Sequence, residues 1–282
     1  MFKSNHSVFK AWSARLLLCV LLASSAAAYA GRSCEAQHPP QAKVVERGLN
    51  LAERTLAVLD ASGQQVVLLA RVGQDLSKYG VYYSHFGFAY QQPQMMANGK
   101  PGHVWRVLHK LNQCGTADAF VYSQGLGEFF LDDLWRYEAA WVVPSLEVQN
   151  RLLPMLLESG RGSRALAMNS RPYSIVSYVW GSKYQQSNQW AIETLAAAME
   201  PQIKTREQAQ AWLQQKGYEP ATLRIGALTR LGGRVTAANV AFDDHPNDKR
   251  FSDRIETVTV DSVFHWMQRS GLGAAPVGVR LP

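Results

Sequence analysis

The feature that most constrains the fold is a polar segment that runs directly into an apolar helix. Residues 183–190 read Lys-Tyr-Gln-Gln-Ser-Asn-Gln-Trp, and residues 191–199 are rich in alanine and other strong helix formers. Apolar side chains recur close to helical spacing at Trp190, Leu195, Ala198 and Met199. This pattern predicts a buried helix that begins near Asn188, against which the rest of the chain must pack.

Ser187 lies at the start of this predicted helix, and its position allows two interpretations. Ser and Asn are common helix caps because their side-chain oxygens accept hydrogen bonds from unpaired backbone N–H groups, so Ser187 and Asn188 can simply cap the helix. A nucleophile at the same place would lie at the positive end of the helix dipole, which stabilises an anion. The residues alone leave both interpretations open.

A second stretch, residues 81–90, is dense in aromatic and β-branched residues and predicts a strand. Alternation along this strand places His85 and Gly87 on the same face. Residues 104–111 alternate well enough to be its antiparallel partner, and they carry His109. The sequence therefore predicts two paired strands that each present a histidine.

These motifs resemble those of a known superfamily. Residues 84–88, Ser-His-Phe-Gly-Phe, are similar to the Ser-His-Val-Gly-Ile strand of circularly permuted NlpC-type papain-like hydrolases, in which the catalytic His precedes the nucleophile. Residues 187–191 align with the Cys-Ser-Glu-Leu-Val segment of that group, so Ser187 stands where the family has its Cys. Residues 140–158 resemble the intervening strand and helix. Over residues 34–270 the chain resembles an uncharacterised bacterial group, domain-of-unknown-function family 2145.

The resemblance implies an α+β fold with a papain-like, permuted NlpC-type core of antiparallel sheet plus helices over residues 31–200. Residues 201–282 would form an appended C-terminal α+β segment packed on that core. The implied activity is hydrolysis of an amide or ester, with Ser187 as nucleophile and His85 as base. A cell-wall peptide or a related acyl compound is the implied substrate.

Papain-like sites also need a third polar group that binds the second ring nitrogen of the catalytic His. In this superfamily the group lies on the strand after the His, which makes His109 the candidate and leaves Asn112 and His103 as alternatives. His109 can equally be a partly buried strand residue with a backbone partner.

The serine at position 187 argues against catalysis. A Cys thiol has a pKa near 8.5 and is readily held as a thiolate beside a His, whereas a Ser hydroxyl must lose its proton during the attack. The alternative function is therefore a non-catalytic papain-like module that binds a cell-wall peptide or a periplasmic protein partner.

Aromatic and amide side chains near the two motifs are the expected substrate-binding residues. They are Tyr83, Tyr173, Tyr184, Asn188, Gln189 and Trp190. Aromatic walls suit a flat amide or glycan ligand, but they are also ordinary core residues.

Residues 1–30 predict a secretory signal peptide and hence a periplasmic protein. Three basic residues precede an apolar run over residues 16–28, and the segment ends in Ala28-Tyr29-Ala30, which is typical of a cleavage site. The run is too short for a bilayer that needs about 20 apolar residues, so we expect no integral membrane protein.

Removing this leader lowers the formal net charge from +7 to +4 and removes one of three cysteines. So mild a charge, without basic clusters among aromatic residues, gives no support for nucleic-acid binding. An exported chain that keeps Cys34 and Cys114 predicts one disulfide bond between them.

The C-terminal part contains a helix signal and two strand-like runs. Residues 205–208 form a capping-box sequence that predicts the start of a helix. Residues 221–231 and 234–242 predict two strands joined by a hairpin turn at Gly232-Gly233. Earlier in the chain, residues 115–127 are interpreted as a loop.

Two acidic clusters are candidate metal sites. Asp132-Asp133 has no His or Cys at ligand spacing nearby. Asp243, Asp244 and His245 form a tempting metal or acid–base cluster, but turn-forming neighbours favour a solvated loop. We therefore expect neither a metal nor a cofactor.

Overall fold

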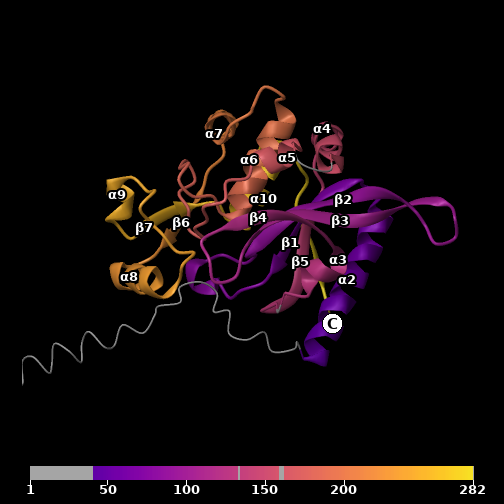
Figure 1. The fold of residues 1–282 in the computed structure, drawn as a ribbon, viewed down its shortest axis with the longest axis horizontal. Helices are drawn as coiled ribbons and strands as arrows, with labels where there is room; N and C mark the ends of the chain where they lie inside the picture. The colour runs from indigo at the N-terminus through magenta and orange to yellow at the C-terminus, as the bar shows by residue number, and fades with distance from the viewer. Residues whose placement is uncertain (1–40, 133, 159–161, 282) are drawn as a thin grey trace, which may run out of the picture.

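A six-stranded antiparallel sheet forms the centre of the protein. The computed structural model describes residues 41–281 except residues 133 and 159–161. The strand order is β4-β3-β2-β1-β5-β8 (Figure 1). The strands are β1 (Val66–Val72), β2 (His85–Met95), β3 (Pro101–Asn112), β4 (Ala119–Gly125), β5 (Arg136–Val142) and β8 (Val277–Arg280). With helices on its faces, the fold is α+β, as the sequence predicts.

Helices cover both faces of this sheet (Figure 1). One face carries α2 (Ala42–Ser62) and α3 (Leu126–Phe130). The other carries α4 (Leu146–Leu157), α5 (Arg164–Ala167), α6 (Ser187–Met199), α7 (Arg206–Gln215) and α10 (Val260–Arg269). Strand β1 is buried along its whole length because alternate side chains point into the two layers.

The C-terminal part contributes to this core and also builds a smaller unit. Strand β8 pairs with β5, and α10 packs Phe264 and Trp266 into the same hydrophobic core as α6. The smaller unit contains the two-stranded sheet of β6 (Ala221–Arg224) and β7 (Arg254–Thr257), with α8 (Ala227–Thr236) and α9 (Asn247–Arg250).

Several local predictions are confirmed. Strands β2 and β3 pair antiparallel, with Phe88 opposite Leu108, as the alternation predicts. Thr205 caps α7 through the predicted capping box, in which the Gln208 side chain binds back to the Thr205 N–H.

Two other local predictions are wrong. Residues 227–236 form helix α8 instead of a hairpin, and β6 pairs with β7 instead. A Cβ added to Gly233 would lie 3.3 Å from the Val240 side chain. This glycine therefore lets Val240, which follows α8, pack closely against the helix. Residues 119–125, expected as part of a loop, form the edge strand β4. Its residues Phe120, Val121 and Tyr122 are good strand formers, so the sequence carries a short strand signal that the loop assignment overlooked.

A buried ion pair holds the segment that leads into α6. The Glu193 side chain is fully buried in α6, and its carboxylate accepts hydrogen bonds from Arg206 Nε at 2.8 Å and Gln210 Nε2 at 2.8 Å. Arg206 also donates to the backbone carbonyls of Ser182 and Tyr184. The path of the chain before Ser187 is therefore set by this ion pair.

Gln185 connects the ion pair to the sheet. Its amide nitrogen donates to Glu193, and its amide oxygen accepts from Lys110 Nζ on β3 at 2.7 Å. Lys110 is fully buried, and desolvation, with help from the Arg206 charge, lowers the pKa of its ammonium to about 7. The residue two positions before Ser187 is thus fixed to both α6 and β3.

No helix in the described residues has the length and apolar character that a transmembrane helix requires.

Replacing Glu193 by Ala should destabilise the fold strongly. The substitution leaves the buried Arg206 guanidinium without its carboxylate, which typically costs about 3–5 kcal/mol. Urea unfolding followed by circular dichroism measures this change. Glu147→Ala is the matched control, because Glu147 is exposed on α4 and its pair with Arg151 is worth under about 0.5 kcal/mol. A loss below about 1 kcal/mol for Glu193→Ala would contradict the assignment.

Candidate functional site

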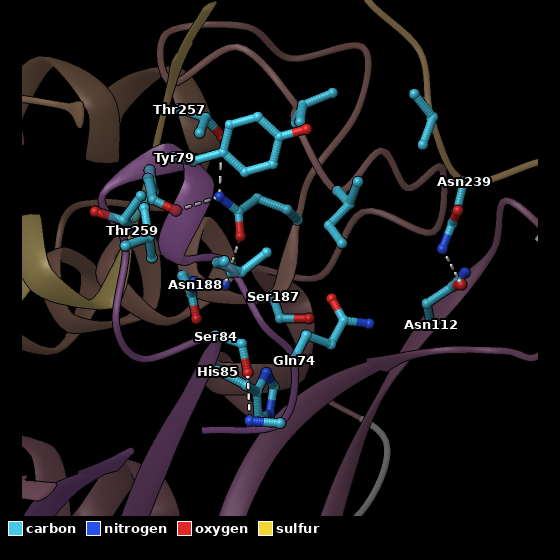
Figure 2. Close-up of a pocket in the computed structure, with 18 of the residues that line it drawn as sticks. Gln74, Tyr79, Ser84, His85, Asn112, Ser187, Asn188, Asn239, Thr257 and Thr259 are labelled. Atoms are coloured by element: carbon cyan, nitrogen blue, oxygen red, sulfur yellow. Dashed lines mark hydrogen bonds between the residues drawn. The ribbon is translucent and has the colours of Figure 1, made fainter. Parts of the chain in front are cut away.

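Ser187 and His85 line the same cavity. The cavity has a volume of about 450 Å³, within the range of small-molecule sites. Its walls come from the segment before β2, the end of β3, residues 173–176, the start of α6, and the C-terminal unit around β6 and α8. Figure 2 shows Ser187, His85 and Ser84 in one part of this cavity.

Ser187 is the first residue of α6 and does not cap it. The cap is Gln186, whose side-chain oxygen accepts a hydrogen bond from the Asn188 N–H at 3.2 Å. The other end of the Gln186 amide donates to Thr257 Oγ1 at 3.1 Å and to the Val258 carbonyl. The capping interpretation of Ser187 is therefore wrong, because the preceding residue performs that role.

His85 belongs to a chain of three polar side chains. His85 Nε2 lies 2.8 Å from His109 Nδ1, and His109 Nε2 lies 2.8 Å from the side-chain oxygen of Gln124. The three residues come from the neighbouring strands β2, β3 and β4, in that order. His109, the expected third group, thus contacts His85, and Gln124 extends the chain by one member that the sequence analysis missed.

The hydrogen bonds among these three side chains determine which ring nitrogens of His85 and His109 carry a proton. The Gln124 amide oxygen is an acceptor, so His109 must carry its proton on Nε2 and accept at Nδ1. His85 then donates through Nε2, and in the neutral ring this tautomer leaves Nδ1 without a proton. Burial, reinforced by the positive charge of Arg71, lowers the pKa of His109 to about 4, so His109 is neutral near pH 7.

Gly87 leaves the space that His109 needs to approach His85. A Cβ at Gly87 would lie 2.8 Å from both His109 Cβ and Val107 Cγ1, and 2.9 Å from the Leu108 carbonyl oxygen. A side chain at this position would push β3 away from β2. The glycine two residues after His85 is therefore needed for the second histidine to approach.

Asn188 links the two halves of the site. Its side-chain oxygen accepts a hydrogen bond from the Phe86 N–H at 3.3 Å. Phe86 follows His85, and Asn188 follows Ser187, so one bond ties the backbone beside the histidine to the start of α6. Asn188 also lines the cavity, as predicted for a substrate-binding residue.

Arg71 brings a positive charge to the cavity. It is 4% exposed, donates to the Phe129 carbonyl and to the Asp132 carboxylate, and is the register partner of His85 on β1. Its guanidinium lies 4.7 Å from the centre of the Phe129 ring. The sequence analysis missed Arg71, although an arginine inside an otherwise apolar strand is a usable signal, and it weighed Asp132 only as a metal ligand.

The other expected binding residues divide into two groups. Tyr83 and Tyr173 line the cavity. Gln189 and Trp190 are buried and bind backbone carbonyls, including those of residues 179 and 165, while the Tyr184 hydroxyl donates to Asp243. These last three residues lie outside the cavity wall, where they hold neighbouring segments in place.

The two alternatives to His109 bind other groups, although Asn112 also lines the cavity. The Asn112 amide donates to the carbonyls of Thr116 and Asp118 and closes the turn between β3 and β4. His103 is largely exposed and lies 3.5 Å from Asp60. Among the three candidates, His109 is the one that contacts His85.

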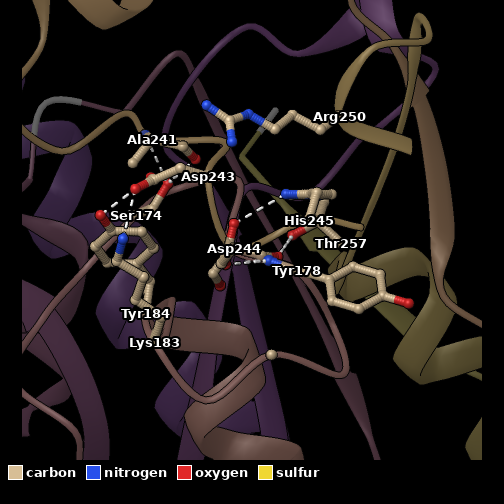
Figure 3. Close-up of polar contacts among 12 residues, drawn as sticks. Ser174, Tyr178, Lys183, Tyr184, Ala241, Asp243, Asp244, His245, Arg250 and Thr257 are labelled. Carbon is tan, nitrogen blue, oxygen red and sulfur yellow. Dashed lines mark hydrogen bonds and ion pairs between the residues drawn. The ribbon is translucent and has the colours of Figure 1, made fainter. Parts of the chain in front are cut away.

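Asp244 and His245 form a buried structural cluster and not a solvated loop (Figure 3). Their side chains are 1% and 0% exposed, and His245 Nδ1 lies 2.9 Å from the Asp244 carboxylate. The other Asp244 oxygen accepts from the Tyr178 N–H at 2.7 Å. Asp243 binds Lys183 and Tyr184 instead. The expectation of a solvated loop is wrong because these groups fasten the C-terminal unit to residues 178–184.

In the described part of the chain, no group of three or more His, Cys, Asp or Glu side chains has the arrangement of a metal site. The leader over residues 1–30 and Cys34 lie outside the described residues, as does Asp133. The disulfide between Cys34 and Cys114 therefore stays a prediction.

His109 should make the protein less stable in acid. Its folded pKa of about 4 lies below the value of 6.5 for an unperturbed histidine, so the unfolded chain binds more protons between these values. Stability should therefore fall as the pH drops from about 6.5 to about 4, by up to about 3 kcal/mol.

Urea unfolding of wild type and His109→Asn at several pH values tests this expectation. The variant should lose much of the slope between pH 6.5 and 4, whatever its absolute stability. His103→Asn is the control, because that ring is exposed. An unchanged slope in His109→Asn would rule out His109 as the source.

Comparison with known proteins identifies a family for the chain. No curated protein and no solved structure matches it significantly. Residues 58–267 match a family described as "Uncharacterized protein conserved in bacteria (DUF2145)". The matched region includes all of His85, His109, Gln124 and Ser187 and spans more than half of the sequence. The chain therefore belongs to the DUF2145 family.

Proposed function

We propose that this protein is an exported hydrolase of amides or esters, in which Ser187 attacks the carbonyl carbon and His85 accepts its proton. The observation that carries the proposal is the ordered chain from His85 through His109 to Gln124, which ends at the cavity that Ser187 also lines. Such a chain fixes the tautomer of a general base, which a purely structural histidine does not require.

In the proposed reaction, the proton of the Ser187 hydroxyl passes to His85 Nδ1 while the oxygen bonds to the substrate carbonyl. His85 then returns that proton to the departing amine or alcohol, which leaves an acyl ester on Ser187. A water molecule, deprotonated by His85, releases the acid and restores the serine. Neutral His109 accepts a hydrogen bond from the His85 Nε2–H throughout and so holds the His85 ring in position.

The start of α6 suits the negative charge that develops on the carbonyl oxygen. Ser187 is the first helical residue, where backbone N–H groups lack intrahelical partners and the helix dipole is positive. Arg71 also lines the cavity, where its charge is paired with the Asp132 carboxylate. The start of the helix stabilises an oxyanion more than a neutral carbonyl.

The resemblance to circularly permuted NlpC-type hydrolases supports the same assignment. A histidine on an antiparallel strand, followed later in the chain by a nucleophile at the start of a buried helix, is the arrangement that this superfamily implies. The predicted leader at residues 1–30 would deliver the protein to the periplasm, where cell-wall peptides and acyl compounds of the envelope are available as substrates.

A non-catalytic binding module is the second candidate. Within the described residues, the Ser187 hydroxyl makes no hydrogen bond, and a serine replaces the cysteine of the related group. In many hydrolases the nucleophile and base approach each other only when substrate binds, so this geometry is compatible with either function. A ligand-binding protein would keep the cavity and lose the reactivity.

A fluorophosphonate probe should label the purified mature protein at Ser187. Labelling should fall at least about tenfold in Ser187→Ala and in His85→Ala, because each removes a group that acts in the attack. Gel fluorescence and mass spectrometry of the labelled peptide measure this. Ser145→Ala is the matched control, since Ser145 also begins a helix but caps α4 away from the cavity.

Ser187→Cys separates the two candidate functions. In an activated site, the new thiol should react with iodoacetamide faster than an ordinary cysteine at pH 6, and His85→Ala should remove that advantage. Absence of labelling in folded wild type, together with ordinary reactivity of the new cysteine, would favour the binding module.

A further inference from the structure

We propose that the cavity binds the acyl chain of an amphiphilic ester or amide, with the chain in an apolar arm and the carbonyl group at Ser187. The inference rests on the proposed hydrolase function and names its substrate class. It makes that function more specific, because cell-wall peptides, the other implied substrate class, need a cavity that offers hydrogen-bond partners to their amide groups.

The apolar arm is lined by a hydrophobic cluster distinct from the two cores of the main sheet. Its members that reach the cavity are Val81, Val176, Leu223, Ile225, Val240 and Phe242. They come from the segment before β2, the loop before α6 and the C-terminal unit. In a closed core such side chains would fill the space between them, whereas here they line one part of a cavity whose whole volume is about 450 Å³.

Three polar side chains that line the cavity, those of Asn239, Thr257 and Thr259, are already bound within the protein. Asn239 donates to Asn112 at 3.0 Å, as Figure 2 shows. Thr257 donates to the Ser177 carbonyl at 2.8 Å, and Thr259 accepts from the Ser262 N–H as the cap of α10. A ligand in this part of the cavity therefore meets mainly apolar surface.

This distribution separates acyl chains from peptides. A peptide in the arm would bury amide groups without hydrogen-bond partners, which costs about 1–3 kcal/mol for each group. A hydrocarbon chain has no such groups and gains from burial. At the other end, His85, Ser187 and Arg71 supply the polar contacts that an ester or amide carbonyl requires.

Helix α8 separates the cavity from an apolar outer surface. Thr229 and Gly233 on this helix line the cavity. On the other face of the helix, Leu228, Leu231 and Val235 are 85%, 62% and 54% exposed. These three side chains therefore lie outside the arm and do not extend it.

Binding to Ser187→Ala tests the inference without requiring catalysis. Dansyl-undecanoic acid is the fluorescent probe, and straight-chain alkanoic acids of 4 to 12 carbons are the competitors. Affinity should rise by up to about fourfold for each added methylene until the arm is filled. A flat response to chain length, or stronger competition by a cell-wall peptide than by dodecanoic acid, would overturn the inference.

Val240→Trp, made in the Ser187→Ala background, should block the arm. Binding of the 10- and 12-carbon acids should weaken at least tenfold, whereas the 4-carbon acid should bind as before. Ile225→Ala is the opposite change and should move the preferred length to longer chains. Leu146→Trp on the exposed face of α4 is the matched control and should change nothing. Equal affinities in all four proteins would overturn the inference.

The outcomes also distinguish this inference from the proposed function. Fluorophosphonate labelling at Ser187 with a flat chain-length response would keep the hydrolase and overturn the acyl arm. A steep chain-length response without labelling would support the arm and assign the protein as an acyl-binding module.

Discussion

The rest of the structure depends on the hydrogen bonds that the buried carboxylate of Glu193 accepts. This carboxylate binds Arg206 and Gln210 of α7 and Gln185 ahead of α6. Burying such charges costs about as much free energy as their attraction returns, so the pair adds little net stability. Its contribution is geometric, because Arg206 also binds the carbonyls of Gly181, Ser182 and Tyr184 and so fixes the path by which the chain enters α6.

That path places Ser187 opposite a sheet in which three strands each supply one polar group. His85, His109 and Gln124 lie on neighbouring strands, so their spacing follows from the spacing of the strands. Gly87 permits the close approach, and Asn188 ties α6 to β2 next to His85. The candidate site is thus built on rigid elements, although its apolar walls come from loops and the C-terminal unit.

The neutral partner of His85 bears on the proposed chemistry. A carboxylate would stabilise the imidazolium that forms when a serine loses its proton, whereas neutral His109 mainly orients the ring. Arg71 strengthens this neutrality because its charge opposes protonation of His109. A serine whose base has a neutral partner is activated less than the serine of a triad with aspartate, so the proposed reaction would depend more on the helix dipole at the start of α6.

The sequence by itself determined the local elements whose signals are periodic or chemical. Alternation around His85 and His109 specified paired strands with both rings on one face, and the alanine-rich run specified α6. Only the tertiary structure decided which residues meet. Nothing local shows that the strand of Gln124 pairs with β3 beside His109, and Lys110, Glu193 and Arg206 are distant in sequence. It also decided that Gln186 caps α6 and that Asp244 and His245 are buried. The physical reason is that periodicity reports which face of an element is buried, whereas pairing of polar groups depends on long-range packing that no local pattern contains.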